Sequence, residues 1–223
     1  MIERRIGHAI SSAACALAML LASRPAIAGD EPKEKDASHG RFDGDLAVAG
    51  SLGMTLGPRA PRAAADVRFR YLSTAGLFAT YEDGPLIGAR SEPRRVLAVG
   101  VELRPLFLGR WGTDRELGNP RLDLLIDSLG LELGAVFMQP DGARFGARPG
   151  LQVGLGLELP IFANASGPFV GLHGGVRWSD AALSGGPVDG PSDRALYLTV
   201  VIGWQQLFGG HVVDMGDRSK TPK

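Results

Sequence analysis

Large aliphatic residues occupy every second position in several separate stretches of this chain. The pattern is clearest at 97–104 (LAVGVELR) and 151–159 (LQVGLGLEL), where the intervening residues are small, polar or charged. Side chains on a β-strand point alternately to its two faces, so each stretch presents one aliphatic face and one small or polar face. Beyond residue 28, no segment sustains apolar residues at helical spacing. We therefore predict an all-β fold.

Seven stretches share this alternation, at 46–56, 66–71, 97–104, 129–134, 151–159, 170–178 and 196–205. An eighth, weaker stretch around 77–81 (LFATY) could turn either face inward. No apolar run after residue 28 reaches the roughly 20 residues that a transmembrane helix needs. If the chain spans a membrane, it does so with strands.

The non-aliphatic faces distinguish two kinds of β fold. A soluble sandwich fills its core with large side chains and turns its other face to water. In this chain the other face is mostly Gly, Ala, Ser and Thr with isolated charges, and Gly accounts for 32 of the 223 residues. That composition suits the narrow lumen of a membrane barrel whose aliphatic face meets lipid. We predict an antiparallel up-and-down transmembrane β-barrel, with a soluble sandwich as the alternative.

Chain length indicates the number of strands. Residues 42–208 supply about 20 residues per strand if there are eight, which suits the smallest barrels, whereas twelve strands would leave too little chain for loops. Outer-membrane barrels carry aromatic residues at both membrane interfaces. The aromatic residues that fall near predicted strand ends are Tyr71, Phe107, Phe162, Trp178, Trp204 and Phe208.

The beginning of the chain predicts export. Arg4 and Arg5 precede an apolar stretch at 9–22, and small residues follow at Ala26 and Ala28. This arrangement is typical of a secretory signal peptide, here residues 1–28, cleaved before Gly29. A membrane anchor is the alternative, but the stretch is too short to span a bilayer. The single cysteine, Cys15, lies inside the signal, so the mature chain has no thiol for a disulfide or a cysteine-based site.

The mature chain divides into three parts. We interpret 29–41 as a flexible charged leader, 42–208 as the barrel and 209–223 as a polar C-terminal tail. With both ends in the periplasm, the connections at 58–62, 83–92, 139–145 and 179–192 face outward, and those at 73–75, 109–120 and 162–166 face inward. The alternation changes phase after 109–120. Either a bulge near Asp127 and Ser128 resets the strand, or 122–127 forms a short helical turn at the rim.

The signal peptide, the apolar-outward alternation and a last strand from Tyr197 to Phe208 that ends on an aromatic residue together resemble small outer-membrane β-barrel proteins of Gram-negative bacteria. The resemblance implies a location in the cell outer membrane, contact with outer-membrane lipid and lipopolysaccharide, and insertion by the barrel-assembly machinery. It is a resemblance of pattern, and it assigns no functional residue.

Composition excludes some classes of function. Lys plus Arg and Asp plus Glu each number 24, so the net charge is zero, and no basic stripe with interleaved aromatic residues indicates nucleic-acid binding. His39 and His211 lie in the flanking segments without the ligand spacing of a metal site. We expect no metal and no other cofactor.

Charged residues recur on the faces predicted to line the lumen. Buried charges are costly unless they are paired, and arginine–carboxylate pairs are efficient. Four acids and four arginines are available, so we predict a salt-bridge ladder that plugs the barrel. An open conduit for small solutes is the alternative. The predicted lumen network comprises Asp66, Arg68, Arg70, Glu102, Arg104, Glu132, Glu158, Arg177 and, on the same side as Arg177, His173.

His173 also allows an enzymatic alternative. Some outer-membrane barrels are lipid-modifying hydrolases that use a histidine with a serine and an acid, and Ser179 and Asp180 follow His173 closely in sequence. Such a triad needs all three groups within hydrogen-bond reach. We interpret His173 instead as a hydrogen-bonding residue of the lumen. The predicted function is therefore a non-enzymatic barrel with a structural or surface-interaction role.

Overall fold

The computed structural model describes residues 39–41, 43–57, 60–87, 93–113, 115–140, 142–185 and 194–209. All of them belong to one compact unit, which begins at Asp36. The predicted signal peptide at 1–28, the leader up to residue 38 and the tail from residue 210 lie outside the described residues.

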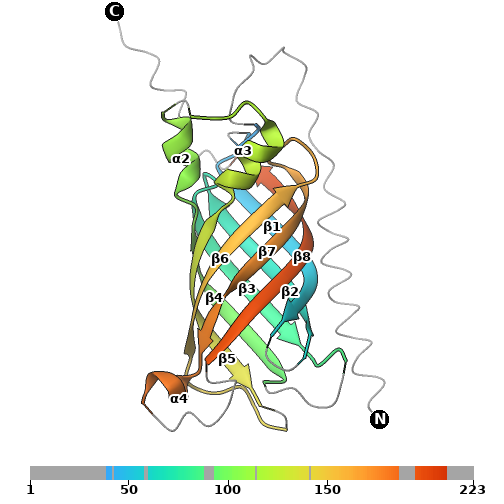
Figure 1. The fold of residues 1–223 in the computed structure, drawn as a ribbon, viewed down its shortest axis with the longest axis vertical. Helices are drawn as coiled ribbons and strands as arrows, with labels where there is room; N and C mark the ends of the chain where they lie inside the picture. Colours follow the sequence, from blue (N-terminus) through green and yellow to red (C-terminus); the bar gives the residue numbers. More distant parts are fainter. Residues whose placement is uncertain are drawn as a thin grey trace, which may run out of the picture. The chain divides into compact units, whose positions relative to one another are not determined.

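The described residues form one closed sheet of eight strands (Figure 1). Each strand pairs antiparallel with the next in sequence, and β8 pairs with β1 to close the barrel. The strands are β1 (Leu46–Leu56), β2 (Arg62–Tyr71), β3 (Ala75–Asp83), β4 (Arg95–Leu103), β5 (Gly130–Gln139), β6 (Gly150–Pro160), β7 (Gly167–Trp178) and β8 (Arg194–Phe208).

The predicted eight-stranded, antiparallel, up-and-down barrel is confirmed, and the sandwich alternative is wrong because one sheet closes on itself. The weak stretch at 77–81 forms the middle of β3. Its ambiguity is resolved by the barrel: Phe78 and Thr80 are buried in the interior, whereas Leu77 is 60% exposed on the outside. Large side chains thus occupy both faces of β3, which is why alternation alone did not orient it.

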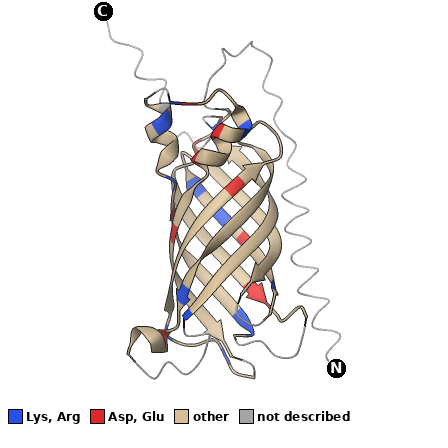
Figure 2. Cartoon of the chain, viewed as in Figure 1, with Lys and Arg blue, Asp and Glu red and all other residues tan. Residues whose placement is uncertain are grey.

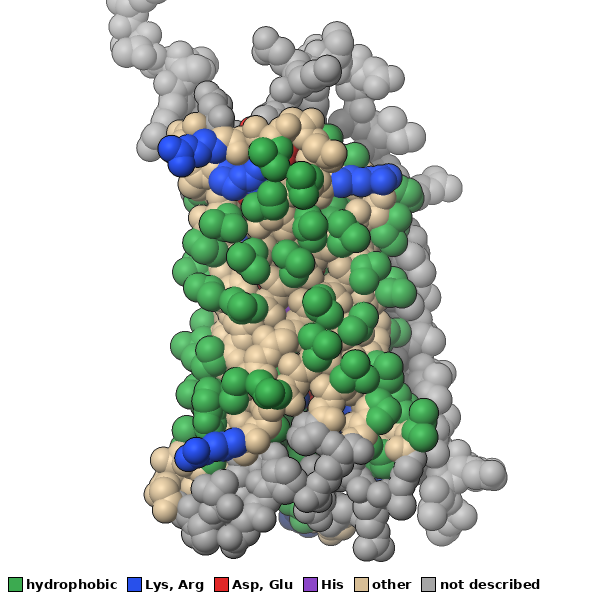
Figure 3. Space-filling model, viewed as in Figure 1, with side chains coloured by type: hydrophobic (Ala, Val, Ile, Leu, Met, Phe, Trp, Pro, Cys, Tyr) green, Lys and Arg blue, Asp and Glu red, His purple; other side chains and the backbone are tan. Residues whose placement is uncertain are grey.

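The outer wall of the barrel is apolar. Leu77, Ile202 and Leu196 are 60%, 65% and 75% exposed, although they lie on regular strands. Hydrophobic side chains cover the visible wall in Figure 3, and Lys or Arg side chains flank it at both ends. On the strands the charged residues are sparse (Figure 2). The distribution is inverted relative to a water-soluble protein, in which apolar residues are the ones most often buried.

Two helices lie over one end of the barrel, which we call the capped end. They are α2 (Leu106–Trp111) and α3 (Pro120–Asp127), both between β4 and β5 (Figure 1). The third described helix, α4 (Asp180–Leu183), lies at the opposite end, between β7 and β8. None of the helices in the described part of the chain has the length and apolar character needed to cross a membrane.

The helix α3 settles the two interpretations of 122–127 in favour of a helical segment at the rim. Pro120 occupies its first turn, where a missing N–H costs nothing. The side chain of Asn119 caps the helix by accepting a hydrogen bond from the Leu122 N–H at 3.3 Å. No bulge is needed, because β5 starts afresh at Gly130.

One expected membrane-interface residue lies elsewhere. Phe107 is only 1% exposed. The chain leaves β4 and enters α2 after its N-cap Pro105, and this helix turns the ring inward across the mouth of the barrel. The remaining aromatic residues near strand ends stay on the outside: Phe162 and Phe208 are 57% and 44% exposed, and Tyr71, Trp178 and Trp204 are half-buried.

Close strand contact requires glycine at particular positions. A Cβ atom added at Gly53 in β1 would lie 1.9 Å from the Val200 carbonyl oxygen of β8, at the seam that closes the barrel. By contrast, a Cβ atom at Gly109 in α2 would meet nothing within 4 Å.

We therefore expect Gly53→Ala to destabilise the barrel severely, and Gly109→Ala to leave it intact. Overpacking typically costs about 1–3 kcal/mol, and a clash with backbone belongs at the upper end of that range. The measurement is urea unfolding of the refolded protein in detergent micelles, followed by gel mobility without boiling. Equal stability of the two variants would contradict the close approach of β1 and β8.

Candidate functional site in the barrel lumen

The interior of the barrel carries matched numbers of opposite charges. Among the described residues, five arginines and five carboxylates line the lumen, and each is at most 6% exposed. Alternation along the strands explains their placement, since every second side chain points inward. They are Arg62, Arg68, Arg70, Arg104 and Arg177, with Asp66, Glu82, Glu102, Glu132 and Glu158.

Arg68 is the centre of this network. Its Nε lies 2.7 Å from Asp66 Oδ2, two residues earlier on the same face of β2. Its Nη1 reaches Glu132 Oε1 at 2.7 Å and Glu102 Oε2 at 3.1 Å. The hydroxyl of Thr80 donates a 2.6 Å hydrogen bond to the remaining oxygen of Asp66. One guanidinium therefore satisfies carboxylates from β2, β4 and β5.

The sheet register makes that cation necessary. Glu102 of β4 and Glu132 of β5 are direct cross-strand partners, and both point inward. Like charges placed opposite each other destabilise a strand pair, and burial increases the penalty. Arg68 lies between the two carboxylates and offsets their repulsion.

Towards the capped end, two arginines and two glutamates form a ring. Arg104 lies 2.6 Å from Glu102 and 2.8 Å from Glu158. Arg70 lies 3.1 Å from Glu102 and also contacts Glu158. The Arg70 guanidinium donates a further 2.6 Å hydrogen bond to Gln205 in β8.

Towards the α4 end, a second group is built around Glu82. Arg62 and Arg177 lie 2.9 and 2.7 Å from its two carboxylate oxygens. Arg177 also donates a 2.6 Å hydrogen bond to Gln152 and stacks 4.0 Å above the ring of Tyr197. A glutamate is thus held between two arginines that come from β2 and β7.

All nine predicted lumen residues are buried inside the barrel. The structure joins eight of them through shared ion pairs and hydrogen bonds, and places Arg177 in the separate group around Glu82. His173 belongs to the larger network: its Nδ1 lies 2.8 Å from Glu132 Oε1 and 3.1 Å from Arg68 Nη2.

Sequence analysis missed Arg62 and Glu82. Arg62 fell at the end of a predicted loop, and Glu82 followed the weak stretch at 77–81. A signal was present for Arg62, since it continues the inward phase of Asp66 and Arg68 at intervals of two residues. Glu82 continues the phase of Phe78 and Thr80 in the same way.

The structure does not bring Ser179 within hydrogen-bond reach of His173. His173 lies in the middle of β7, five residues before its end at Trp178, whereas Ser179 follows the strand. At about 3.3 Å per residue, the serine and histidine are separated by about 20 Å along the chain. The Ser179 side chain instead caps α4 by accepting a hydrogen bond from the Ala182 N–H at 3.1 Å.

The capped end contains its own buried ion pairs. Asp127 of α3 lies 2.7 Å from Arg110 of α2 and 2.7 Å from Arg41. Arg110 also contacts Asp123, which is fully buried. The Arg41 guanidinium lies 4.4 Å above the ring of Phe107. Together these residues, which we call the rim cluster, fasten the two helices to each other and to the segment before β1.

The rim cluster changes the expected boundary of the leader. Residue 41 was expected in the flexible leader, but Arg41 is 3% exposed and ion-paired with Asp127. Charge composition gave no sign of this contact, because it depends on where α3 presents Asp127.

Two ionisations in the rim cluster are shifted. Burial on its own would raise the pKa of Asp123, but the Leu117 N–H at 2.9 Å and the guanidinium of Arg110 stabilise the charged form, so its pKa lies below the ordinary 3.8. For Arg41, burial lowers the pKa, although Asp127 partly compensates.

Three small cavities lie among the described residues of the barrel interior. A cavity of about 50 Å³ lies between the rim cluster and the ring of Arg70, Arg104, Glu102 and Glu158. Two smaller cavities of about 10 Å³ each adjoin Arg177. A single water needs roughly 10–15 Å³, so these spaces fit a few waters. Within the described part of the chain, no group of three or more His, Cys, Asp or Glu side chains is arranged to hold a metal ion.

Comparison with known proteins gives similarity of fold alone. No protein family and no curated protein matches the chain. Among solved structures, it is similar to the N-terminal β-barrel domain of Pseudomonas aeruginosa OprF, with 9% identity over 73% of this chain and 98% of that one, at a TM-score of 0.43. It is also similar to Ail, the attachment invasion locus protein of Yersinia pestis, solved with the heparin analogue sucrose octasulfate, with 10% identity over 72% and 96% of the two chains and a TM-score of 0.33. At these values the similarity transfers no residue role.

Replacing Arg68 with methionine should destabilise the barrel by about 3–5 kcal/mol, because it removes one partner from a buried ion pair and leaves carboxylates uncompensated. Urea unfolding in micelles measures the loss. The matched control is Arg95→Met, since the Arg95 and Asp83 side chains are 36% and 45% exposed, and an exposed pair contributes about 0–1 kcal/mol. Similar losses in the two variants would contradict the central role of Arg68.

The rim cluster should loosen in acid before the strands do. Since the folded-state pKa of Asp123 is lowered, its stabilising contribution is complete above the ordinary value and is lost as the pH falls through the folded value. Hydrogen exchange of α3, corrected for intrinsic rates, should therefore increase as the pH is lowered below the ordinary 3.8, while strand amides stay protected. Asp123→Asn should show faster exchange of α3 already at neutral pH. Unchanged α3 protection in both cases would refute this assignment.

Proposed function

We propose that this chain spans the outer membrane of a Gram-negative bacterium as a closed, non-conducting β-barrel with a structural or surface-interaction role and no catalytic activity. The observation that carries the proposal is the inverted placement of side chains. Aliphatic residues cover the outer wall, and ion-paired charges line the lumen alongside two small apolar clusters. A wall of this kind is unfavourable in water, since fully burying one such side chain gains about 1.5–3 kcal/mol.

Strand dimensions support a spanning role. The eight described strands are 9 to 15 residues long. A tilted transmembrane strand needs about 9–11 residues, so even the shorter strands suffice. Closure of β8 on β1 also leaves no free strand edge in lipid.

Aromatic side chains support two membrane interfaces. On the outer wall, Phe208 and Phe162 are exposed near the capped end, and Tyr81 and Trp178 lie near the α4 end. Aromatic residues at both borders of an apolar band are typical of outer-membrane barrels.

The positions of the two chain ends define the proposed orientation. The first strand begins and the last strand ends at the capped end, where Leu46 pairs with Phe208. If both chain ends face the periplasm, the connections 84–94, 140–149 and 179–193 face the cell surface, where they contact lipopolysaccharide and external partners. The longest connection, 104–129 with α2 and α3, then faces the periplasm. Export through a cleaved signal at 1–28, and insertion by the barrel-assembly machinery, are parts of this proposal.

The lumen favours a plug over a channel. An unbalanced ring of charge would suit a selective pore, but here five arginines face five carboxylates and are paired with them. Opening a path would require breaking several buried ion pairs at once. The barrel would thus act as a rigid anchor for its surface loops.

The full chain should fractionate with the outer membrane, require detergent for extraction and change gel mobility on boiling. Reconstituted in a planar bilayer, it should pass no single-channel current. Recovery in the soluble fraction after lysis would overturn the membrane proposal. Stable conductance steps would overturn the plug.

A control variant shows that the bilayer assay can detect an opened lumen. Arg68→Ala combined with Glu132→Ala removes one cation and one anion, so the net charge of the lumen is kept. If this variant folds, as judged by gel mobility without boiling, we expect it to conduct where the original chain does not.

A further inference from the structure

We propose that α3 and the segment before it form a binding surface for anionic phospholipid at the periplasmic face of the membrane. This inference rests on the proposed membrane orientation and adds a partner to it. The occupant is the headgroup layer of the inner leaflet, and the surface consists of Arg115, Arg121, Leu122, Leu125 and Leu129.

The helix α3 is amphipathic in an unusual sense. Its acidic residues Asp123 and Asp127 are buried towards the lumen, where they pair with Arg110. Leu122 and Leu125 are three residues apart on the opposite side of the helix, and Leu129 follows directly after its C-cap Ser128. Leu122 and Leu129 are 41% and 38% exposed. The outward face of α3 is therefore apolar.

That apolar face continues the outer wall of the barrel. Leu129 leads directly into β5, where Leu131 and Leu133 are 52% and 51% exposed. In Figure 3 the hydrophobic side chains extend upward from the strands to the level of the helices. The apolar outer surface of the strands therefore continues through Leu129 onto α3.

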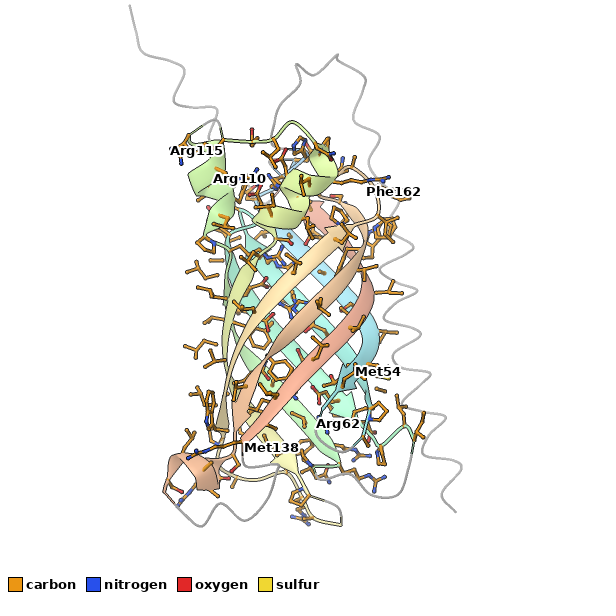
Figure 4. All side chains as sticks on the ribbon, in the orientation of Figure 1. Met54, Arg62, Arg110, Arg115, Met138 and Phe162 are labelled. Atoms are coloured by element: carbon orange, nitrogen blue, oxygen red, sulfur yellow. The ribbon has the colours of Figure 1, made fainter. Side chains whose placement is uncertain are left out.

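Two arginines border this surface. Arg115 and Arg121 are exposed, and within the described residues their guanidinium groups make no ion pair. Figure 4 shows Arg115 at the capped end beside Arg110, and Figure 3 shows Lys and Arg side chains at the upper margin of the hydrophobic band. Arg110, in contrast, is held by Asp123 and Asp127.

Charge complementarity identifies the occupant. An interfacial helix with an apolar face and bordering cations binds anionic lipid through both features. Near an anionic membrane surface, each Lys or Arg strengthens binding about fivefold. Phosphatidylglycerol serves as the probe for an anionic headgroup at this leaflet, whereas lipopolysaccharide would lie at the opposite end of the barrel.

The test uses the full chain in vesicles of phosphatidylcholine, with and without phosphatidylglycerol. After mild detergent extraction, native mass spectrometry measures the ratio of the two lipids retained. We expect enrichment of phosphatidylglycerol, reduced about fivefold for each arginine lost in Arg115→Gln with Arg121→Gln, and weakened by added salt. The matched control is Arg144→Gln with Arg148→Gln, which removes two exposed arginines between β5 and β6 at the other end.

A second readout follows the leucines. With Cys15 replaced by serine, Leu125→Cys provides a single site for a fluorescent label in α3. Lipids brominated near the headgroup should quench that label, and should leave a label at Leu183→Cys in α4 less affected. Equal quenching at both sites would overturn contact between α3 and the leaflet.

Several results would overturn the inference while leaving the barrel proposal intact. One is insertion with normal heat-modifiable mobility but no preference for phosphatidylglycerol. Another is an equal loss of preference in the control variant, and a third is stronger retention of added lipopolysaccharide at the same arginines. Failure to associate with vesicles at all would instead refute the proposed function itself.

Discussion

A charge inside a closed eight-stranded sheet has almost no water to stabilise it, so it must be paired with another charge. That constraint organises the interior of this protein. The register of β4 and β5 places Glu102 opposite Glu132, and only a cation from elsewhere in the barrel makes the pair tolerable. Arg68 reaches both from β2. The ring towards the capped end and the group around Glu82 repeat the same solution, with Arg70 and Arg62 of β2 joined by Arg104 and Arg177 respectively.

In the rim cluster buried charges are paired as well, although here most of the paired residues lie on α2 and α3 and not on strands. Between β4 and β5 the chain leaves the sheet and crosses the barrel mouth as α2 and α3. Phe107 fills the opening, and Asp123 and Asp127 turn inward to meet Arg110 and Arg41. In the helices as in the strands, the buried charges therefore point inward and the exposed aliphatic residues point outward, while Phe107 and the clusters around Phe78 and Phe169 fill part of the interior with apolar groups.

The sequence was sufficient to predict the barrel, because a period of two is a local property that every strand repeats. It also oriented residues such as Glu132 and Arg177 inward. It did not predict the rim cluster, since Arg41 and Asp127 are distant in sequence and meet only through tertiary contacts. The prediction for Phe107 was wrong for a related reason. The direction of the chain after Pro105 is set by the packing of α2 over the open end of the barrel, which is a tertiary contact. Arg62 was missed at the edge of a loop, where strand ends are least certain.

The pairing of Glu102 with Glu132 bears on how the barrel assembles. A hairpin of β4 and β5 on its own would bring two carboxylates together before their shared cation is present. Arg68 comes from β2, which is separated from β4 in the sheet by β3. Arg104, which directly follows β4, can neutralise Glu102 within that hairpin, but the cation of Glu132 is Arg68 of β2. Entry into lipid one hairpin at a time would therefore expose an unneutralised Glu132, whereas concerted insertion of a nearly closed sheet would not. The buried ion pairs thus favour insertion into the membrane late in assembly and in one cooperative step.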